Sequence, residues 1–142
     1  MKDNVIKSFE AGEDLQVGIL VKIQDGKVYK ANNVTDAILG VTDSSVKKGK
    51  AADVILAGVA YVQVAGATNV GDILVAKEDG KAQAFSFDIF ADLTADTTVH
   101  TVGKVLEADE TGAYLQTAIT NTVLIVPKQK TTDTEPTNEE KV

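Results

Sequence analysis

One unit of sequence occurs twice in this chain, and it constrains the fold more than any other feature. A branched Ile-Leu-Val run precedes Asp25-Gly26, and a second Ile-Leu-Val run precedes Asp79-Gly80, 54 residues further along. Asp and Gly tolerate the positive φ angles that a type I′ turn requires at its two central residues. Each unit therefore predicts a β-hairpin, and the two hairpins are expected to be alike.

The similarity continues beyond the hairpins. Gly40 is followed nine residues later by Gly49, and Gly103 is followed nine residues later by Gly112. A run of residues suited to a strand comes after each of the second glycines. Two repeats are too few for a solenoid. The sequence instead predicts one barrel or sandwich whose halves resemble each other.

The composition supports an all-β fold. The chain has 142 residues, of which 44% are hydrophobic and only 5% aromatic, so the core must consist of Val, Ile, Leu and Ala. Branched residues pack well on pleated surfaces. We expect a small β-barrel or β-sandwich of short antiparallel strands over residues 10–127. Residues 128–142 are polar and are expected to form a disordered tail, since they carry too little apolar surface to bury.

A segment between the halves, residues 85–100, holds three of the four Phe residues. Phe85, Phe87 and Ile89 have the spacing of a strand, and residues 91–94 suit a helical turn. We expect an excursion that packs aromatic side chains against the sheet or a neighbouring subunit. The candidate oligomer contacts are Phe85, Phe87 and Phe90.

Charge and residue usage exclude several classes of function. The net charge is −7, and all fourteen basic residues are Lys. Without Arg, and with an acidic surface, the chain is not expected to bind nucleic acid, which requires phosphate neutralisation. There is no Cys for disulfides or thiolate chemistry. No apolar run approaches the length of a membrane span, and no signal peptide is visible, so we expect synthesis in the cytoplasm and no membrane partner.

A catalytic centre is not expected. His100 is the only histidine, so a multi-histidine metal site is impossible. Ser86, Asp88 and Asp96 are available as partners, but their spacing gives no reason for them to assemble around His100. The residues that flank His100 alternate as in a strand, so a strand-edge histidine is the favoured interpretation over a catalytic one.

The acidic and basic turns give little support for a catalytic or binding site. Paired carboxylates suit acid–base chemistry when they face each other across a cleft, but each pair here lies beside Gly in a predicted turn, where solvated acids are common. The pairs are Glu13-Asp14, Glu78-Asp79 and Asp109-Glu110. The basic turn at residues 47–50 is interpreted as a solvated loop, with contact to an acidic partner as the alternative. No phosphate loop or calcium loop is present, so we expect no enzyme activity, cofactor or metal.

The assembled features resemble the capsid decoration (cement) proteins of tailed phages. Residues 60–75 carry a strand and a Gly71-Asp72 turn that lead to the second Asp-Gly-Lys hairpin, as in that family, and the similarity spans residues 5–126. It implies a small β-barrel or sandwich that forms homotrimers on the outer capsid surface of the virion. There it would bind the major capsid protein and stabilise the shell by bridging capsomers.

The same resemblance implies an N-terminal arm, at residues 1–9, that orders on the capsid. Its apolar side chains are the candidate capsid contacts, namely Val5, Ile6 and Phe9. An extended arm can add a strand to a sheet edge of the capsid protein. An ordinary first strand of the chain's own sheet is an equally supported alternative.

A second function class stays open. The chain could be a carbohydrate- or surface-binding β module of a phage fibre or adhesin, in which Tyr61 or Tyr114 would stack on a sugar. The low aromatic content weighs against this alternative.

Overall fold

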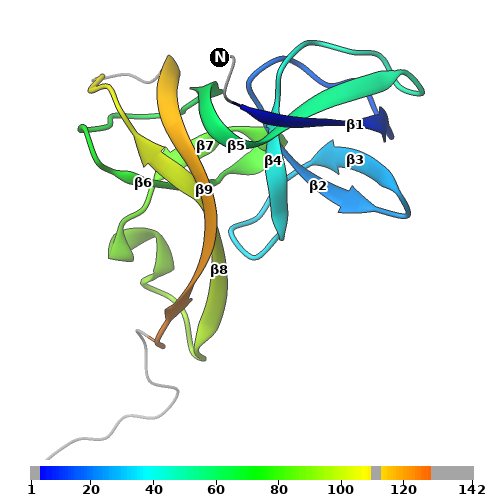
Figure 1. Ribbon diagram of the computed structural model, residues 1–142. Helices are drawn as coiled ribbons and strands as arrows, with labels where there is room; N and C mark the ends of the chain where they lie inside the picture. Colours follow the sequence, from blue (N-terminus) through cyan, green and yellow to red (C-terminus); the bar gives the residue numbers. More distant parts are fainter. Residues whose placement is uncertain (1–3, 110–112, 129–142) are drawn as a thin grey trace, which may run out of the picture.

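The computed structural model describes residues 4–109 and 113–128, which form nine strands and two short 3-10 helices (Figure 1). The all-β prediction is confirmed. The elements are β1 (Val5–Ala11), β2 (Leu20–Gln24), β3 (Lys27–Lys30), β4 (Ile38–Thr42), β5 (Ala51–Gln63), β6 (Ile73–Ala76), η1 (Glu78–Gly80), β7 (Ala82–Ala84), η2 (Phe87–Phe90), β8 (Thr97–Val105) and β9 (Tyr114–Val126).

The first five strands close into a barrel. Their order is β1-β3-β2-β4-β5, and β1 returns to pair antiparallel with β5 from Val5↔Ala57 to Glu10↔Ala51. The β1–β3 pairing is parallel, and the other pairings in the ring are antiparallel. Closure pairs both edges of the sheet and so removes the exposed edges of an open sheet.

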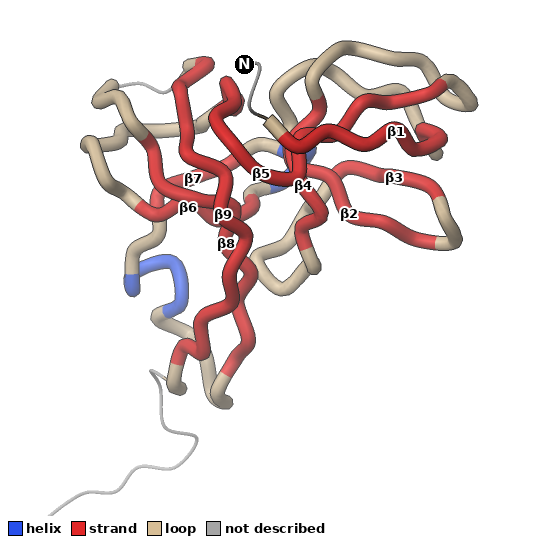
Figure 2. The backbone as a smooth tube through the Cα atoms, in the orientation of Figure 1, coloured by secondary structure: helices blue, strands red, loops and turns tan. Residues whose placement is uncertain are grey.

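The second half repeats this topology with β5 as a shared strand (Figure 2). The second half of β5 takes the place of β1, and β6, β7, β8 and β9 take the places of β2, β3, β4 and the first half of β5. Even the parallel contact recurs, as the bridge from Val64 to Ala82 of β7. The two halves are therefore alike in strand order and direction as well as in their hairpins.

Individual contacts recur as well. In the first half, the backbones of Leu15 and Val46 form an antiparallel bridge that ties together two long loops. In the second half, Thr68 and Asp109 form the matching bridge. The repeat thus extends to the loops between the strands.

The two hairpin turns have the predicted backbone. Asp25 and Gly26 have φ angles of 54° and 79°, and Asp79 and Gly80 have φ angles of 62° and 75°. Positive φ at both central residues is the property that makes Asp-Gly suitable for this turn. Both predicted hairpins are confirmed, as β2–β3 and β6–β7.

Gly40 and Gly103 occupy matching positions where two strands approach closely. A Cβ atom on Gly40 would overlap the carbonyl oxygen of Ile55, and one on Gly103 would overlap the carbonyl oxygen of Ala118. Only glycine fits where another backbone comes this near. The glycine pair found in the sequence thus marks one packing requirement that both halves share.

The hydrophobic core has a separate cluster inside the first barrel and a larger one that continues through the second half. The first includes Leu15, Val21 and Val54. The larger cluster joins Leu74 of the second half to Leu20 of the first. The two halves therefore pack against each other through buried aliphatic side chains, and they are not separate domains.

The segment at residues 85–100 differs in part from the prediction. Phe87–Phe90 form the 3-10 helix η2 and not a strand, so the strand interpretation is wrong, and the helical turn lies before residues 91–94. The Ser86 hydroxyl accepts a hydrogen bond from the Asp88 N–H (3.2 Å), which caps this turn. The turn directs Phe90 into a cluster with Val75 and Val99, so the expected packing of aromatics against the sheet is observed.

Residues 5–9, expected as part of an arm, lie in β1 and pair with β5. The Asn4 side chain extends this pairing, because its Oδ1 accepts from the Val59 N–H (2.9 Å) and its Nδ2 donates to the Val59 carbonyl (2.8 Å). The structure thus gives these residues the alternative role of a first strand. Residues 1–3 and 129–142, with most of the expected tail, lie outside the described residues.

Candidate interaction surfaces

The possible catalytic groups are not assembled into a site. The His100 backbone N–H donates to the carbonyl of Val34 (3.0 Å), which lies in the loop between β3 and β4. Ser86 caps η2, and Asp96 accepts from the Lys128 N–H (2.9 Å). Within the described part of the chain, no hydrogen bond joins His100 to Ser86, Asp88 or Asp96. The strand position expected for His100 is observed in β8.

Glu13 and Asp14, the acidic pair between β1 and β2, accept hydrogen bonds from backbone N–H groups. Glu13 accepts from the Lys30 N–H (2.8 Å), and Asp14 accepts from the Lys48 N–H (2.8 Å). That Lys48 hydrogen bond, with the ammonium groups of Lys47 and Lys30, holds the pKa of Asp14 below its ordinary value. Both carboxylates thus organise turns. Of the other acidic pairs, Glu78 and Asp79 lie in η1, and Asp109 is described whereas Glu110 is not.

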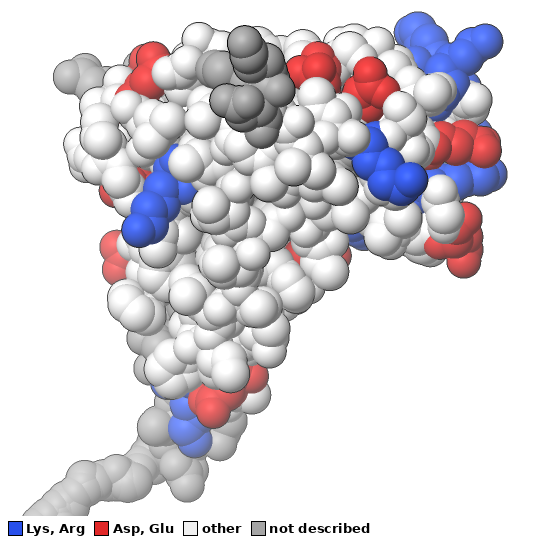
Figure 3. Space-filling model, in the orientation of Figure 1, with Lys and Arg blue, Asp and Glu red and all other residues white. Residues whose placement is uncertain are grey.

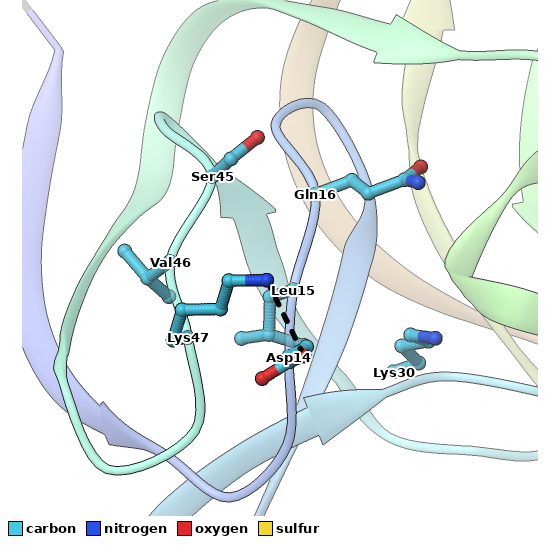
Figure 4. A pocket seen from close by; sticks show the side chains of 7 residues that line it. All are labelled: Asp14, Leu15, Gln16, Lys30, Ser45, Val46 and Lys47. Carbon is cyan, nitrogen blue, oxygen red and sulfur yellow. Dashed lines mark ion pairs between the residues drawn. The ribbon is translucent and has the colours of Figure 1, made fainter.

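A shallow hollow of about 380 Å³ lies beside this loop (Figure 4). Lys47 forms an ion pair with Asp14 (Nζ to Oδ2, 3.8 Å) across it, and both side chains are well exposed. The bridge between Leu15 and Val46 runs along it. Asp14 thus partly neutralises the basic turn at residues 47–50.

Across residues 4–109 and 113–128, no group of three or more His, Cys, Asp or Glu side chains is arranged to hold a metal ion. No helix in those residues has the length and hydropathy to cross a membrane.

Asp36 illustrates how carboxylates serve the fold. Its Oδ2 accepts from the N–H groups of Asn32 (2.8 Å) and Asn33 (3.1 Å) and lies 3.4 Å from the Lys22 ammonium. Partial burial acts to raise the pKa of Asp36, but the two N–H groups and Lys22 outweigh it, and the pKa is lowered. The carboxylate therefore stabilises the β3–β4 loop in its charged form.

We expect Asp36→Asn to lower the free energy of unfolding by about 1–2 kcal/mol at pH 7, since it removes a charge-assisted acceptor. A lowered folded-state pKa gives stability above the ordinary Asp pKa of about 3.9, and this stability is lost as the pH falls through the folded-state value. The difference should thus shrink below pH 4. Urea unfolding across pH 3–7 measures it. Asp25→Asn, in the exposed turn between β2 and β3, is the control.

The candidate capsid contacts differ in exposure. Val5 and Ile6 are 55% and 43% exposed, whereas Phe9 is half-buried and packs against the core of the first barrel. The Lys7 ammonium lies 5.8 Å from the centre of the Phe9 ring. Only Val5 and Ile6 of these three present large apolar surface to solvent.

The candidate oligomer contacts form one aromatic cluster. Phe85 lies edge-to-face with Phe87 (5.2 Å between ring centres) and tilted against Phe90 (5.4 Å). Phe90 is 3% exposed and belongs to the core, whereas Phe87 is 57% exposed. Phe87 and the neighbouring Ile89, which is 42% exposed, form the accessible part of this cluster.

A broad uncharged face covers β9 and the part of β5 that pairs with it (Figure 3). The view shows charged side chains at its margins and none in the middle. In the sequence, residues 54–71 and 111–127 contain no charged residue, and these two runs meet where β5 pairs with β9. The lack of charge in these two runs is the sequence signal that identifies this face.

Two exposed tyrosines lie on this pair of strands. Tyr61 pairs with Gln116, and Gln63 pairs with Tyr114, so Tyr61 and Tyr114 are diagonal neighbours on one face. They are 52% and 47% exposed. The Gln63 amide donates to the Tyr114 hydroxyl (3.0 Å) and fixes that ring. Both tyrosines were candidates for stacking on a sugar from the sequence, but the sequence does not indicate that they share a face.

Comparison with protein-family models and with curated protein sequences finds no match. Among solved structures, the chain is similar to the N base of the head fibre protein gp8.5 of bacteriophage phi29. The similarity has a TM-score of 0.56 and 20% sequence identity, and it covers 82% of this chain and 93% of the other. At this identity the similarity shows that the two chains share a fold.

Proposed function

We propose that this chain is a structural protein of a phage virion that decorates the outer surface of the capsid. The single observation that supports this most is the shared fold with the base of a phage head fibre protein. The resemblance of residues 5–126 to phage decoration proteins supports the same role from the sequence. The partner would be the major capsid protein, and the role would be non-enzymatic stabilisation of the shell.

The surface of the described residues favours attachment to a capsid over catalysis. The described residues assemble no catalytic group around His100, whereas uncharged surface covers β9 and the part of β5 that pairs with it. Val5 lies beside this face, since it pairs with Ala57 of β5. A neutral face on a chain of net charge −7 is suited to a contact that excludes water without opposing charge.

Binding to undecorated capsids of the phage that encodes the protein tests this proposal. We expect saturable co-sedimentation and a higher temperature of capsid rupture. Val5→Lys and Ile6→Lys should weaken binding at least tenfold, because each would bury an unpaired charge. Ile23→Lys, at a similarly exposed position (47%) on β2, is the control. Absence of binding to these capsids would refute the proposal.

A glycan-binding fibre module is the second candidate, favoured by the shared face of Tyr61 and Tyr114. Two exposed rings beside fixed amide groups suit stacking against a neutral sugar. Glycan-array binding that is lost in Tyr61→Ala and kept in Tyr29→Ala would support this candidate. Equal array signals for the wild type, Tyr61→Ala and Tyr29→Ala would count against this candidate.

A further inference from the structure

Within residues 4–109 and 113–128, no strand pairs with one edge of the last half of β9. Pairing between β5 and β9 ends at Gly58↔Ile119, whereas pairing between β8 and β9 continues to Thr97↔Val126. β8 and β9 therefore project from the barrel as a two-stranded ribbon (Figure 1). Among the described residues, the contact along the far edge of this part of β9 is the Asn121 amide, which donates to the Leu39 carbonyl (2.8 Å).

The pairing between β8 and β9 shows which backbone groups of β9 point towards this edge. The His100 N–H donates to Val34, so it points away from β9, and His100 with Val123 is a non-hydrogen-bonded pair. The N–H and C=O of Val123 must then point away from β8. The same holds two residues later for Ile125. No described residue pairs with these groups.

The side chains leave this edge apolar and unprotected. Val123 is 55% exposed and Ile125 is 72% exposed. Proteins usually blunt an edge strand with Lys, Pro or a bulge, yet residues 111–127 contain no charge and their only Pro is Pro127. An uncharged edge of this kind is a template for another strand.

The repeat allows this part of β9 to be compared with the corresponding strand of the first half. Because β9 takes the place of the first half of β5, its continuation beyond Ile119 corresponds to the second half of β5. β9 covers one edge of it, and its end bridges to β7 through Val64 and Ala82. In β9 the extended β8 covers one edge, and the other edge has no strand beside it within the described residues.

We propose that a second copy of this chain pairs with this edge, antiparallel and about a two-fold axis near Leu124. In that register Val123 of one copy lies opposite Ile125 of the other, and the outward N–H and C=O groups of both are paired. Each exposed apolar side chain thus meets another apolar side chain. Self-pairing suits an edge without charge, because two chains of net charge −7 meet there without opposing like charges.

Light scattering of the purified full chain tests the interface. The expected mass is about twice the chain mass of 15.0 kDa. A mass three times the chain mass would overturn this pairing and would favour the trimer that the resemblance to decoration proteins implies. Ile125→Lys and Val123→Lys should raise the dissociation constant of the dimer at least tenfold, since both place like charges across the axis. Val70→Lys is the matched control, because Val70 is 65% exposed in a turn away from this edge. Circular dichroism spectra like that of the wild type would show that the variants fold.

Amide hydrogen exchange locates the contact. The N–H groups of Val123 and Ile125 should exchange slowly in the dimer and at least tenfold faster in Ile125→Lys, while the N–H of Leu124, bonded to β8, should stay slow in both. Several results would overturn the proposal. One is a monomer at every concentration, and another is an oligomer that Ile125→Lys leaves intact. A monomer whose Val123 and Ile125 amides are already protected would also overturn it, and would assign the edge to another segment of the same chain. A monomer that loses capsid binding on Ile125→Lys would assign the edge to the capsid protein.

Discussion

Gly103→Ala is expected to lower the free energy of unfolding by about 3 kcal/mol or more. A Cβ at this position would overlap the Ala118 carbonyl oxygen, and that oxygen belongs to the β9 backbone, which cannot rotate away as a side chain does. Overpacking of this kind typically costs about 1–3 kcal/mol even where the neighbour can adjust. For a chain of this size, the melting temperature should fall by roughly 10 °C. Thermal and urea unfolding measure both quantities.

Two further glycines make the result specific. Gly40→Ala should be similarly costly, because its Cβ would overlap the Ile55 carbonyl. Gly66→Ala is the control, since Gly66 has a φ of 93° but nothing within 4 Å of an added Cβ. It should cost only about 1–2 kcal/mol, from its backbone conformation. Losses in Gly103→Ala and Gly40→Ala no larger than the loss in Gly66→Ala would mean that the close approach of strands does not decide these positions.

Leu74→Ala is expected to cost about 3–4 kcal/mol. Leu74 is fully buried in the cluster that joins the second half to the first, and truncation of a buried Leu removes apolar contacts and leaves a cavity. The β6 backbone on both sides of Leu74 is held by β7 and β8, which limits collapse into the space. Urea unfolding at constant pH gives the loss.

Leu106→Ala is the matched control for this change. Leu106 is 44% exposed, so the same truncation should cost less than about 1 kcal/mol. If Leu74→Ala were equally mild, the second half would be loosely packed, and its hydrophobic core would not be a main source of stability.

Much of the fold follows from local sequence chemistry. The Asp25-Gly26 and Asp79-Gly80 turns were predictable because few dipeptides tolerate positive φ at two successive residues. The barrel closure by β1 was not predictable, because pairing between β1 and β5 depends on contacts distant in the chain. The strand spacing at Phe85 and Phe87 misled because the Ser86 cap and the burial of Phe90 decided the local backbone.

The candidate surfaces were less accessible to sequence reasoning. The exposure of Val5 and the burial of Phe90 cannot be distinguished by residue type, since both are apolar. The edge at Val123 and Ile125 depends on where pairing with β5 stops. Pairing ends at Gly58, opposite Ile119, where Gly58 has a φ of 120°. A lone Gly in a strand indicates irregularity without showing which neighbour is lost.

The shared strand β5 has a consequence for how the molecule unfolds. Its first half is a wall of the first barrel and its second half begins the next, so neither half of the chain holds a complete set of strands alone. Loss of β5 order in one half removes hydrogen-bonding partners from the other. The duplicated architecture therefore behaves as one cooperative unit, in which a local weakness in either half lowers the stability of both.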